Sequence, residues 1–131
     1  MVDVVVGRIA DPPARPYQRI LVDRLWPRGV RKDQASWDEW MRDVAPSAEL
    51  RRWYGHDPSR QGAFRQRYRA ELDASRATPA MRRLLEVARC QPVALLTATR
   101  DVEQSQAPVL AEFLRERLRD SLPMDAGGER G

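Results

Sequence analysis

The sequence predicts an α/β fold: a small, mixed but mainly parallel sheet of three or more strands, covered by about five helices in Rossmann-like layers. Two short apolar runs, residues 20–22 and 93–96, contain no polar residue, and this pattern is typical of strands covered on both faces. Several other segments repeat their apolar residues with the 3.6-residue period of a helix. Alternation of covered strands with amphipathic helices is the pattern of an α/β domain.

Two strands are expected in the first part of the chain. Residues 2–9 predict the first strand, and the proline-rich residues 11–16 predict a stiff loop without helix potential. A parallel neighbour needs a crossover of roughly a dozen residues or more, and this loop is too short to supply one. We therefore expect the first strand and the strand at 20–22 to be antiparallel neighbours, or to be separated by a third strand.

A helical hairpin is expected next. The apolar residues over 37–44 follow a helical period, and Ser36 and Glu39 have the spacing of a capping box. Ser47 is predicted to cap a second, shorter helix that stops at Gly55.

Two longer helices are expected between this hairpin and the second covered strand. Each begins with a capping residue followed by proline, at Asp57-Pro58 and at Thr78-Pro79. The first of them carries a narrow apolar stripe, formed by Phe64, Tyr68 and Leu72. Its remaining surface, which is rich in arginine and acidic residues, is predicted to be a solvated face.

The last part of the chain supplies a strand and a helix. The strand at 93–96 can lie parallel to the strand at 20–22 through a right-handed crossover of the intervening helices. Ser105 is predicted to cap the final helix, which leaves the backbone amides of Gln106 and Ala107 free to attract an anion.

Polar side chains follow both covered strands. Because parallel strands end at the same edge of a sheet, residues 23–28 and 97–101 are expected to emerge together, where open α/β sheets bind ligands. Arginine guanidinium groups at such an edge can hold a phosphate or a carboxylate. Asp23 and His56 are the candidate catalytic residues, as acid–base groups. The predicted ligand-binding residues are Arg24, Trp26, Arg28, Thr97, Thr99, Arg100, Asp101, Ser105 and Gln106.

Each candidate also has a structural interpretation. Asp23 and Arg24 can satisfy each other or other charges, and Trp26 can be a core residue that shapes a turn. His56 can bond a backbone carbonyl in the turn where it lies. The polar residues at 97–101 can simply end their strand by bonding to the backbone.

Size and composition narrow the class of protein. The 131 residues fit one α/β domain, predicted over 1–120, with a flexible tail over 121–131 that is rich in Pro, Gly and charge. The net charge is +4, but 19 acidic residues are interspersed with the 23 basic ones. Neither a basic leader nor a long apolar segment occurs, so we expect a cytoplasmic protein without a membrane contact. The single cysteine, Cys90, excludes an internal disulfide and predicts a buried apolar group.

Several runs in the chain match a known family. They are residues 22–29 (Val-Asp-Arg-Leu-Trp-Pro-Arg-Gly), 38–40, 45–47, 49–51 and 53–58 (Trp-Tyr-Gly-His-Asp-Pro). Over about residues 4–118 the chain resembles the YeaO-like proteins of unknown function. This resemblance implies a compact bacterial α/β domain and names no activity. Before the last helix that family commonly has Asn-His-Ala, whereas residues 105–107 here are Ser-Gln-Ala, so no histidine role is carried over.

Together these observations predict an arginine-rich pocket for a small anionic ligand, such as a nucleotide or a phosphorylated metabolite, at the C-terminal ends of the strands. They specify no reaction and no cofactor, because the sequence contains no glycine-rich phosphate loop, no His/Cys metal spacing and no serine elbow. Two alternatives stay open. One is a nucleic-acid binding module that uses the arginines of residues 60–76 and 82–83. The other is a protein-interaction module, monomer or homodimer, that uses exposed aromatic residues over 37–54.

Overall fold

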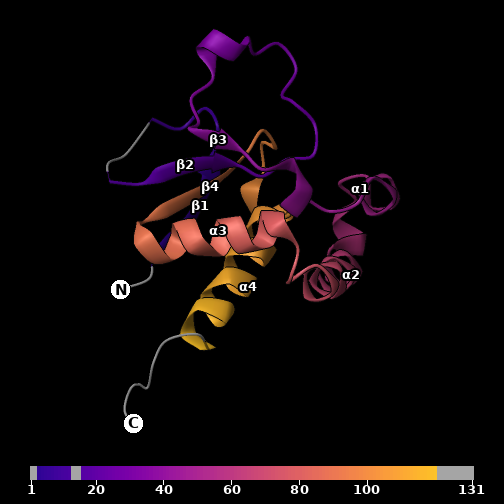
Figure 1. The fold of residues 1–131 in the computed structure, drawn as a ribbon. Helices are drawn as coiled ribbons and strands as arrows, with labels where there is room; N and C mark the ends of the chain where they lie inside the picture. Colours follow the sequence, from indigo (N-terminus) through magenta and orange to yellow (C-terminus); the bar gives the residue numbers. More distant parts are fainter. Residues whose placement is uncertain (1–2, 13–15, 121–131) are drawn as a thin grey trace, which may run out of the picture.

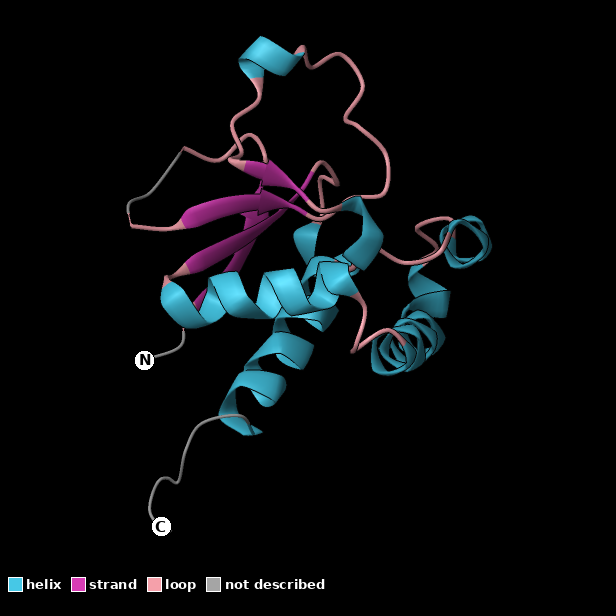
Figure 2. Cartoon of the chain, viewed as in Figure 1, coloured by secondary structure: helices cyan, strands magenta, loops and turns pink. Residues whose placement is uncertain are grey.

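The computed structural model describes residues 3–12 and 16–120, and it confirms the α/β class (Figures 1 and 2). The tail predicted over 121–131 lies outside the described residues. The strands are β1 (Val4–Arg8), β2 (Gln18–Leu21), β3 (Glu39–Trp40) and β4 (Val93–Thr97). The α-helices are α1 (Ala48–Tyr54), α2 (Gln61–Ala74), α3 (Pro79–Cys90) and α4 (Ala107–Asp120).

The sheet has the strand order β1-β4-β2-β3, and every pair of neighbours in the described residues is parallel. Strand β4 therefore separates β1 from β2, which confirms the second of the two arrangements expected for these strands. The sheet contains no antiparallel component among the described residues, in contrast to the mixed sheet that the short loop before β2 indicated. The reason is that β4, which is buried along its whole length, occupies the centre and bonds to both earlier strands.

The two faces of the sheet are covered differently. One face packs into the main core with α3 and α4, and it includes Ile20 and Leu95. The other face carries Leu21 and Leu96, which pack with Trp37 and the partly buried Trp26. Loop segments cover this second face in place of helices, as Figure 1 shows. The layers are therefore Rossmann-like on one side only, and the loop after β2 is fixed by its own apolar cluster.

The helix predicted over 37–44 is wrong. Residues 39 and 40 form the edge strand β3, with Trp40 in register with Leu21, and a 3-10 turn (Arg42–Val44) follows. The Ser36 hydroxyl donates to the Ile9 carbonyl oxygen at 2.7 Å, so it does not cap a helix. The predicted apolar residues are nevertheless buried, because an edge strand followed by a tight turn also brings Trp37, Met41 and Val44 inside.

The other helix starts follow their capping residues. The Ser47 hydroxyl accepts from the Leu50 amide, and Gly55 ends α1 in the left-handed conformation at φ 52°. The Thr78 hydroxyl accepts from the Met81 amide at the start of α3. Asp57 caps a 3-10 turn (Pro58–Arg60) that leads directly into α2. These predictions are confirmed, whereas Cys90 is exposed at the end of α3 and the prediction that it is buried is wrong.

Replacing Ser47 with alanine is expected to lower the free energy of unfolding by about 1 to 2 kcal/mol. The Ser47 hydroxyl caps α1, and a loss of this size is usual when such a cap is removed. The same hydroxyl donates to Glu71 of α2 at 2.6 Å, so the change also loosens the contact between α1 and α2. Urea denaturation measures the difference. Alanine at the exposed Ser59 is the control, and an equal loss in both variants would contradict a special role for Ser47.

None of the helices in residues 3–12 and 16–120 combines the length and apolar character that crossing a membrane requires.

Candidate functional site

A pocket of about 470 Å³ lies at the C-terminal ends of β2 and β4. Its walls come from the loop after β2, from α1 and the residues on either side of it, from the first turn of α2, and from the segment between β4 and α4. The lining residues are Asp23, Arg24, Leu25, Trp26, Pro27, Arg28, Pro46, Arg51, Arg52, Tyr54, His56, Phe64, Ala98, Thr99, Ser105 and Gln106. The pocket is therefore at the sheet edge where the parallel strands predicted it.

Asp23 joins three elements at the floor of the pocket. One carboxylate oxygen accepts from the Ala98 amide at 2.8 Å, and the other accepts from the Gln106 side-chain amide at 2.7 Å. The backbone carbonyl of Asp23 also accepts from the Trp40 indole at 2.7 Å. All these donors are uncharged, so the negative charge of Asp23 is held by hydrogen bonds and not by an ion pair.

Arg24 is fixed by backbone carbonyl groups. Its Nε donates to the Pro46 carbonyl oxygen at 2.8 Å, and Nη2 lies 3.4 Å from the Ala45 carbonyl oxygen. The ion pairs of the described residues do not include Arg24 or Asp23, so these neighbours in sequence do not neutralise each other. The Arg24 side chain thus keeps its positive charge at the pocket wall, in a fixed position.

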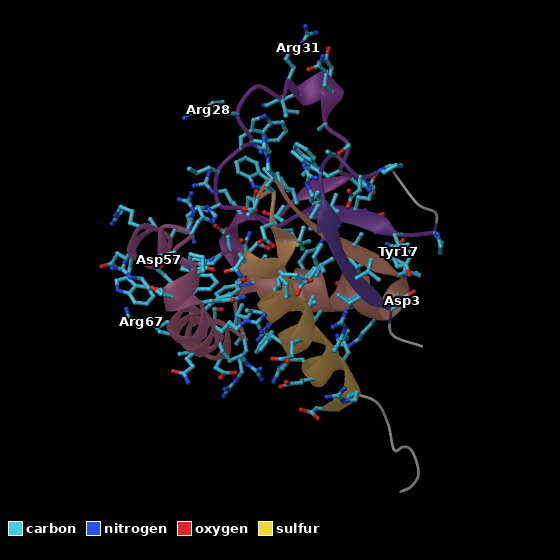
Figure 3. The ribbon with its side chains drawn as sticks, turned by 180° about the vertical axis from the view of Figure 1, so that it is seen from behind. Asp3, Tyr17, Arg28, Arg31, Asp57 and Arg67 are labelled. Atoms are coloured by element: carbon cyan, nitrogen blue, oxygen red, sulfur yellow. The ribbon has the colours of Figure 1, made fainter. Side chains whose placement is uncertain are left out.

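Trp26 has the packing of a core residue and also borders the pocket. Its indole nitrogen donates to the Val30 carbonyl oxygen at 2.6 Å. Its ring meets Trp37 and Trp40 edge-on, at centroid distances of 5.0 and 5.4 Å. Arg28 is exposed and extends from the same loop, as the view from behind shows (Figure 3). The tryptophan cluster therefore gives a rigid base to a loop that carries a free guanidinium group.

The residues at the start of α4 contribute polar side chains to the pocket, and the Ala107 backbone amide is not free. Gln106 donates to the Val22 carbonyl oxygen at 3.0 Å as well as to Asp23. The Ala107 amide, which was expected to be free, donates to the Ser105 hydroxyl at 3.2 Å. The prediction of two free amides is thus wrong for Ala107, because Ser105 lies two residues before α4 and satisfies that amide itself.

Eight of the eleven predicted site residues line the pocket, and Thr97, Arg100 and Asp101 do not. Thr97 ends β4 and is completely buried, and its hydroxyl accepts from the Thr99 amide at 3.0 Å. Arg100 and Asp101 are exposed outside the pocket. The structure therefore does not place Arg24 and Arg100 in one cavity, and the segment after β4 contributes only Ala98 and Thr99 before α4 begins to close the site.

His56 lies at the pocket in the left-handed conformation, with φ 56°. Its ring is exposed, and its centroid lies 6.0 Å from that of Tyr54. The neighbouring Asp57 carboxylate accepts from the Ser59 hydroxyl and amide, and these hydrogen bonds hold the pKa of Asp57 below its ordinary value. Asp57 therefore serves as a cap, as the sequence predicted.

The sequence reasoning missed four lining residues that α1 and α2 supply. Arg51 and Arg52 are exposed on α1, whose rotation is fixed by the buried residues Leu50 and Tyr54. Phe64 of α2 stacks on Tyr54 with a centroid distance of 4.1 Å. The available signal was the arginine pair on the capped helix at 48–54, because a helix with one buried face must present the rest of its surface outward.

The Tyr54 hydroxyl is a neutral donor beside this pocket. It donates to the Gln104 carbonyl oxygen at 2.8 Å. Burial raises the pKa of Tyr54, against a smaller opposite effect of Arg65, so the phenol stays protonated at neutral pH.

The charge around the pocket is strongly positive. Four arginines and the single histidine line it, against one carboxylate. The described part of the chain has no group of three or more His, Cys, Asp or Glu residues that could hold a metal ion. Arginine is well suited to anions because its planar fork matches two oxygen atoms of a phosphate or a carboxylate at once. The arrangement can therefore attract and orient an anion.

Comparisons with known proteins all point to one group. A family model described as the inactive DUF488-N3 subclade matches residues 3–128. An uncharacterized protein of Mycobacterium tuberculosis, Rv3073c, is 49% identical over 100 residues, which are 76% of this chain and 82% of that protein. The uncharacterized protein YeaO of Escherichia coli is 39% identical over 109 residues, which are 82% of this chain and 93% of YeaO. No solved structure matches the chain.

Proposed function

This chain belongs to the inactive DUF488-N3 subclade and is a YeaO-like protein. From the pocket at the C-terminal ends of β2 and β4, which we call the strand-end pocket, we propose that it binds a small anionic ligand, such as a nucleotide or a phosphorylated metabolite. The observation that carries this proposal is the charge imbalance at that pocket. Its four arginines form no ion pair among the described residues, and its only carboxylate, Asp23, is occupied by uncharged donors.

The apolar wall of the pocket supports a ligand with an apolar part beside its charge. Leu25 is 60% exposed, and among the described residues it is the large apolar side chain that is exposed to solvent. Trp26, Tyr54 and Phe64 add aromatic groups to the same lining. A nucleotide combines a flat base with phosphate groups, so it fits a pocket with both an apolar wall and positive charge better than inorganic phosphate does.

Two features favour binding without turnover. Gln106 lies at a position where YeaO-like proteins commonly have histidine, and its amide cannot act as an acid or a base near neutral pH. The Asp23 carboxylate accepts hydrogen bonds through both oxygens, which suits a fixed acceptor more than a group that exchanges protons. The word "inactive" in the description of the family agrees with this proposal.

A panel of nucleoside monophosphates and sugar phosphates should raise the melting temperature of the purified protein. A ligand at about 100 times its dissociation constant stabilises the fold by roughly 2.7 kcal/mol, which corresponds to a shift on the order of 10 °C for a domain of this size. Differential scanning fluorimetry measures the shift. The variant Arg28→Ala should lose most of it, because Arg28 is exposed at the pocket and the change leaves the core intact.

Lys32→Ala is the matched control, since it removes one positive charge from an exposed position on the same loop, outside the pocket. It should respond to the ligand as the original protein does. A flat response of the original protein to the whole panel, or equal losses in both variants, would contradict the proposed pocket.

The structure bears on the two alternative functions, a nucleic-acid binding module and a protein-interaction module. On α2, Arg69 pairs with Glu116 of α4, as expected of a solvated, paired face, whereas Arg67 stacks on the Trp53 ring at 3.9 Å. The aromatic residues needed for a self-association surface over 37–54 are buried or partly buried. The nucleic-acid alternative stays a prediction, and the interaction module has less exposed aromatic surface than it needs.

A further inference from the structure

A second cleft, of about 430 Å³, lies between the turn after α2, helix α3 and helix α4. It shares no lining residue with the strand-end pocket. We call it the arginine cleft, and its lining residues are Arg76, Ala77, Arg82, Leu85, Glu86, Arg89 and Arg117. The contact between α3 and α4 fixes the relative positions of its walls.

Four arginines from three elements line this cleft. Arg82 and Arg89 are seven residues apart on α3, and so they lie on one face of that helix. Arg117 comes from α4, and Arg76 comes from the turn before α3. Glu86 is the one carboxylate in the lining, which leaves an excess of about three positive charges.

Like the arginines of the strand-end pocket, the arginines of the cleft have no carboxylate within ion-pair distance in the described residues. Among residues 3–12 and 16–120, none of the four takes part in an ion pair. By contrast, the adjacent Arg83 pairs with Glu39 at 3.1 Å, and Arg69 pairs with Glu116. Like charges held close together are destabilising unless an anion lies between them.

Arg117 provides an independent observation. Its Nε atom is buried and has no hydrogen-bond partner in the described part of the protein. A buried donor without a partner is costly, and such donors are rare in folded proteins. A ligand that reaches into the cleft and accepts from this atom would remove the cost.

We propose that the arginine cleft binds a compact polyanion of the diphosphate class. Guanidinium groups bind phosphate oxygens in pairs, and two linked phosphates offer enough oxygens and charge for four arginines. A concave site lined by residues of three elements suits a compact anion that several arginines contact at once. An extended nucleic-acid chain is better served by a stripe of charge along an open surface.

The test uses isothermal titration calorimetry of the full chain with sodium pyrophosphate at low salt. Because pyrophosphate can also enter the strand-end pocket, the titration is done in the Arg28→Ala background, and the Nε–H resonance of Arg117 is followed by NMR. We expect saturable one-to-one binding that shifts this resonance. Arg82→Gln and Arg89→Gln should each weaken it about tenfold, the usual effect of losing a hydrogen bond to a charged group.

Arg83→Gln is the matched control, because it neutralises the exposed neighbour of Arg82 on the same helix, outside the cleft. It should change the affinity less than twofold. Equal weakening by Arg82→Gln and Arg83→Gln, or binding that does not saturate, would show diffuse attraction and overturn the proposal. An Arg117 Nε–H resonance that does not shift on addition of pyrophosphate would also overturn the proposal. This readout does not depend on whether the Arg82 and Arg89 variants fold. Binding of a single-stranded oligonucleotide that depends on Arg82 and Arg89, without pyrophosphate binding, would assign the cleft to nucleic acid instead.

Discussion

Replacing Arg19 with alanine is expected to lower the free energy of unfolding by about 3 to 5 kcal/mol, a large share of the stability of an ordinary domain. Arg19 is only 6% exposed, yet it has no carboxylate partner among the ion pairs of the described residues. Its Nε donates to the Ser36 carbonyl oxygen at 2.6 Å, and Nη2 donates to the Asp11 carbonyl oxygen at 3.1 Å. Alanine would leave these partly buried carbonyl groups without their donor and would create a cavity where the buried Arg19 side chain lies.

Urea denaturation of the variants separates these contributions. Arg19→Met keeps much of the side-chain volume and removes the donors, so it should recover part of the loss, while Arg31→Ala, at an exposed surface ion pair, should cost less than about 1 kcal/mol. If alanine at 19 and at 31 had equal effects, the buried guanidinium would not hold the loops together as described.

Replacing Asp23 with alanine is expected to cost about 2 to 4 kcal/mol of stability and to abolish ligand-induced stabilisation. The carboxylate is the shared acceptor for Ala98, at the end of β4, and for Gln106, at the start of α4. Without it, both donors lose their partner and the floor of the strand-end pocket loses its shape. Chemical denaturation gives the stability, and the melting-temperature shift with nucleotide gives the binding.

Asp23→Asn is the informative companion to that variant. Asparagine has nearly the same shape and keeps one oxygen acceptor, but its amide group must face either the Ala98 amide or the Gln106 amide, and each of these is itself a donor. We expect a smaller loss of stability than with alanine. Stability and ligand response both unchanged in Asp23→Ala would contradict the role of this carboxylate as the link between β2, β4 and α4.

Much of the fold could be predicted because local signals decide it. Ser47 and Thr78 cap their helices as expected, since a capping hydroxyl acts within one turn of chain. The segment at 37–44 shows the limit of such reasoning. Its spacing fits one face of a helix, but Trp40 pairs with Leu21, a residue that is distant in sequence. Pairing across the sheet replaced the local preference, and no local pattern encodes the partner.

The candidate site could be predicted where topology alone sets it. Parallel strands β2 and β4 bring Asp23 and Thr99 to one pocket, and this follows from strand direction. Arg100 and Asp101 failed to reach it because the backbone path after β4 depends on the burial of Thr97 and on a 3-10 turn. Arg51 and Arg52 were missed because their position depends on how α1 packs, which only the tertiary structure defines.

The central place of β4 has a consequence for synthesis on the ribosome. Both β1 and β2 bond to a strand that is made only after residue 92, so for most of its translation the nascent chain carries these two segments without the central strand that joins them. Such exposed strands attract chaperones and favour aggregation. A premature stop codon before Val93 would therefore leave β1 without a partner and β2 with only its short pairing to β3, while loss of a few residues after Asp120 would spare every strand and helix described.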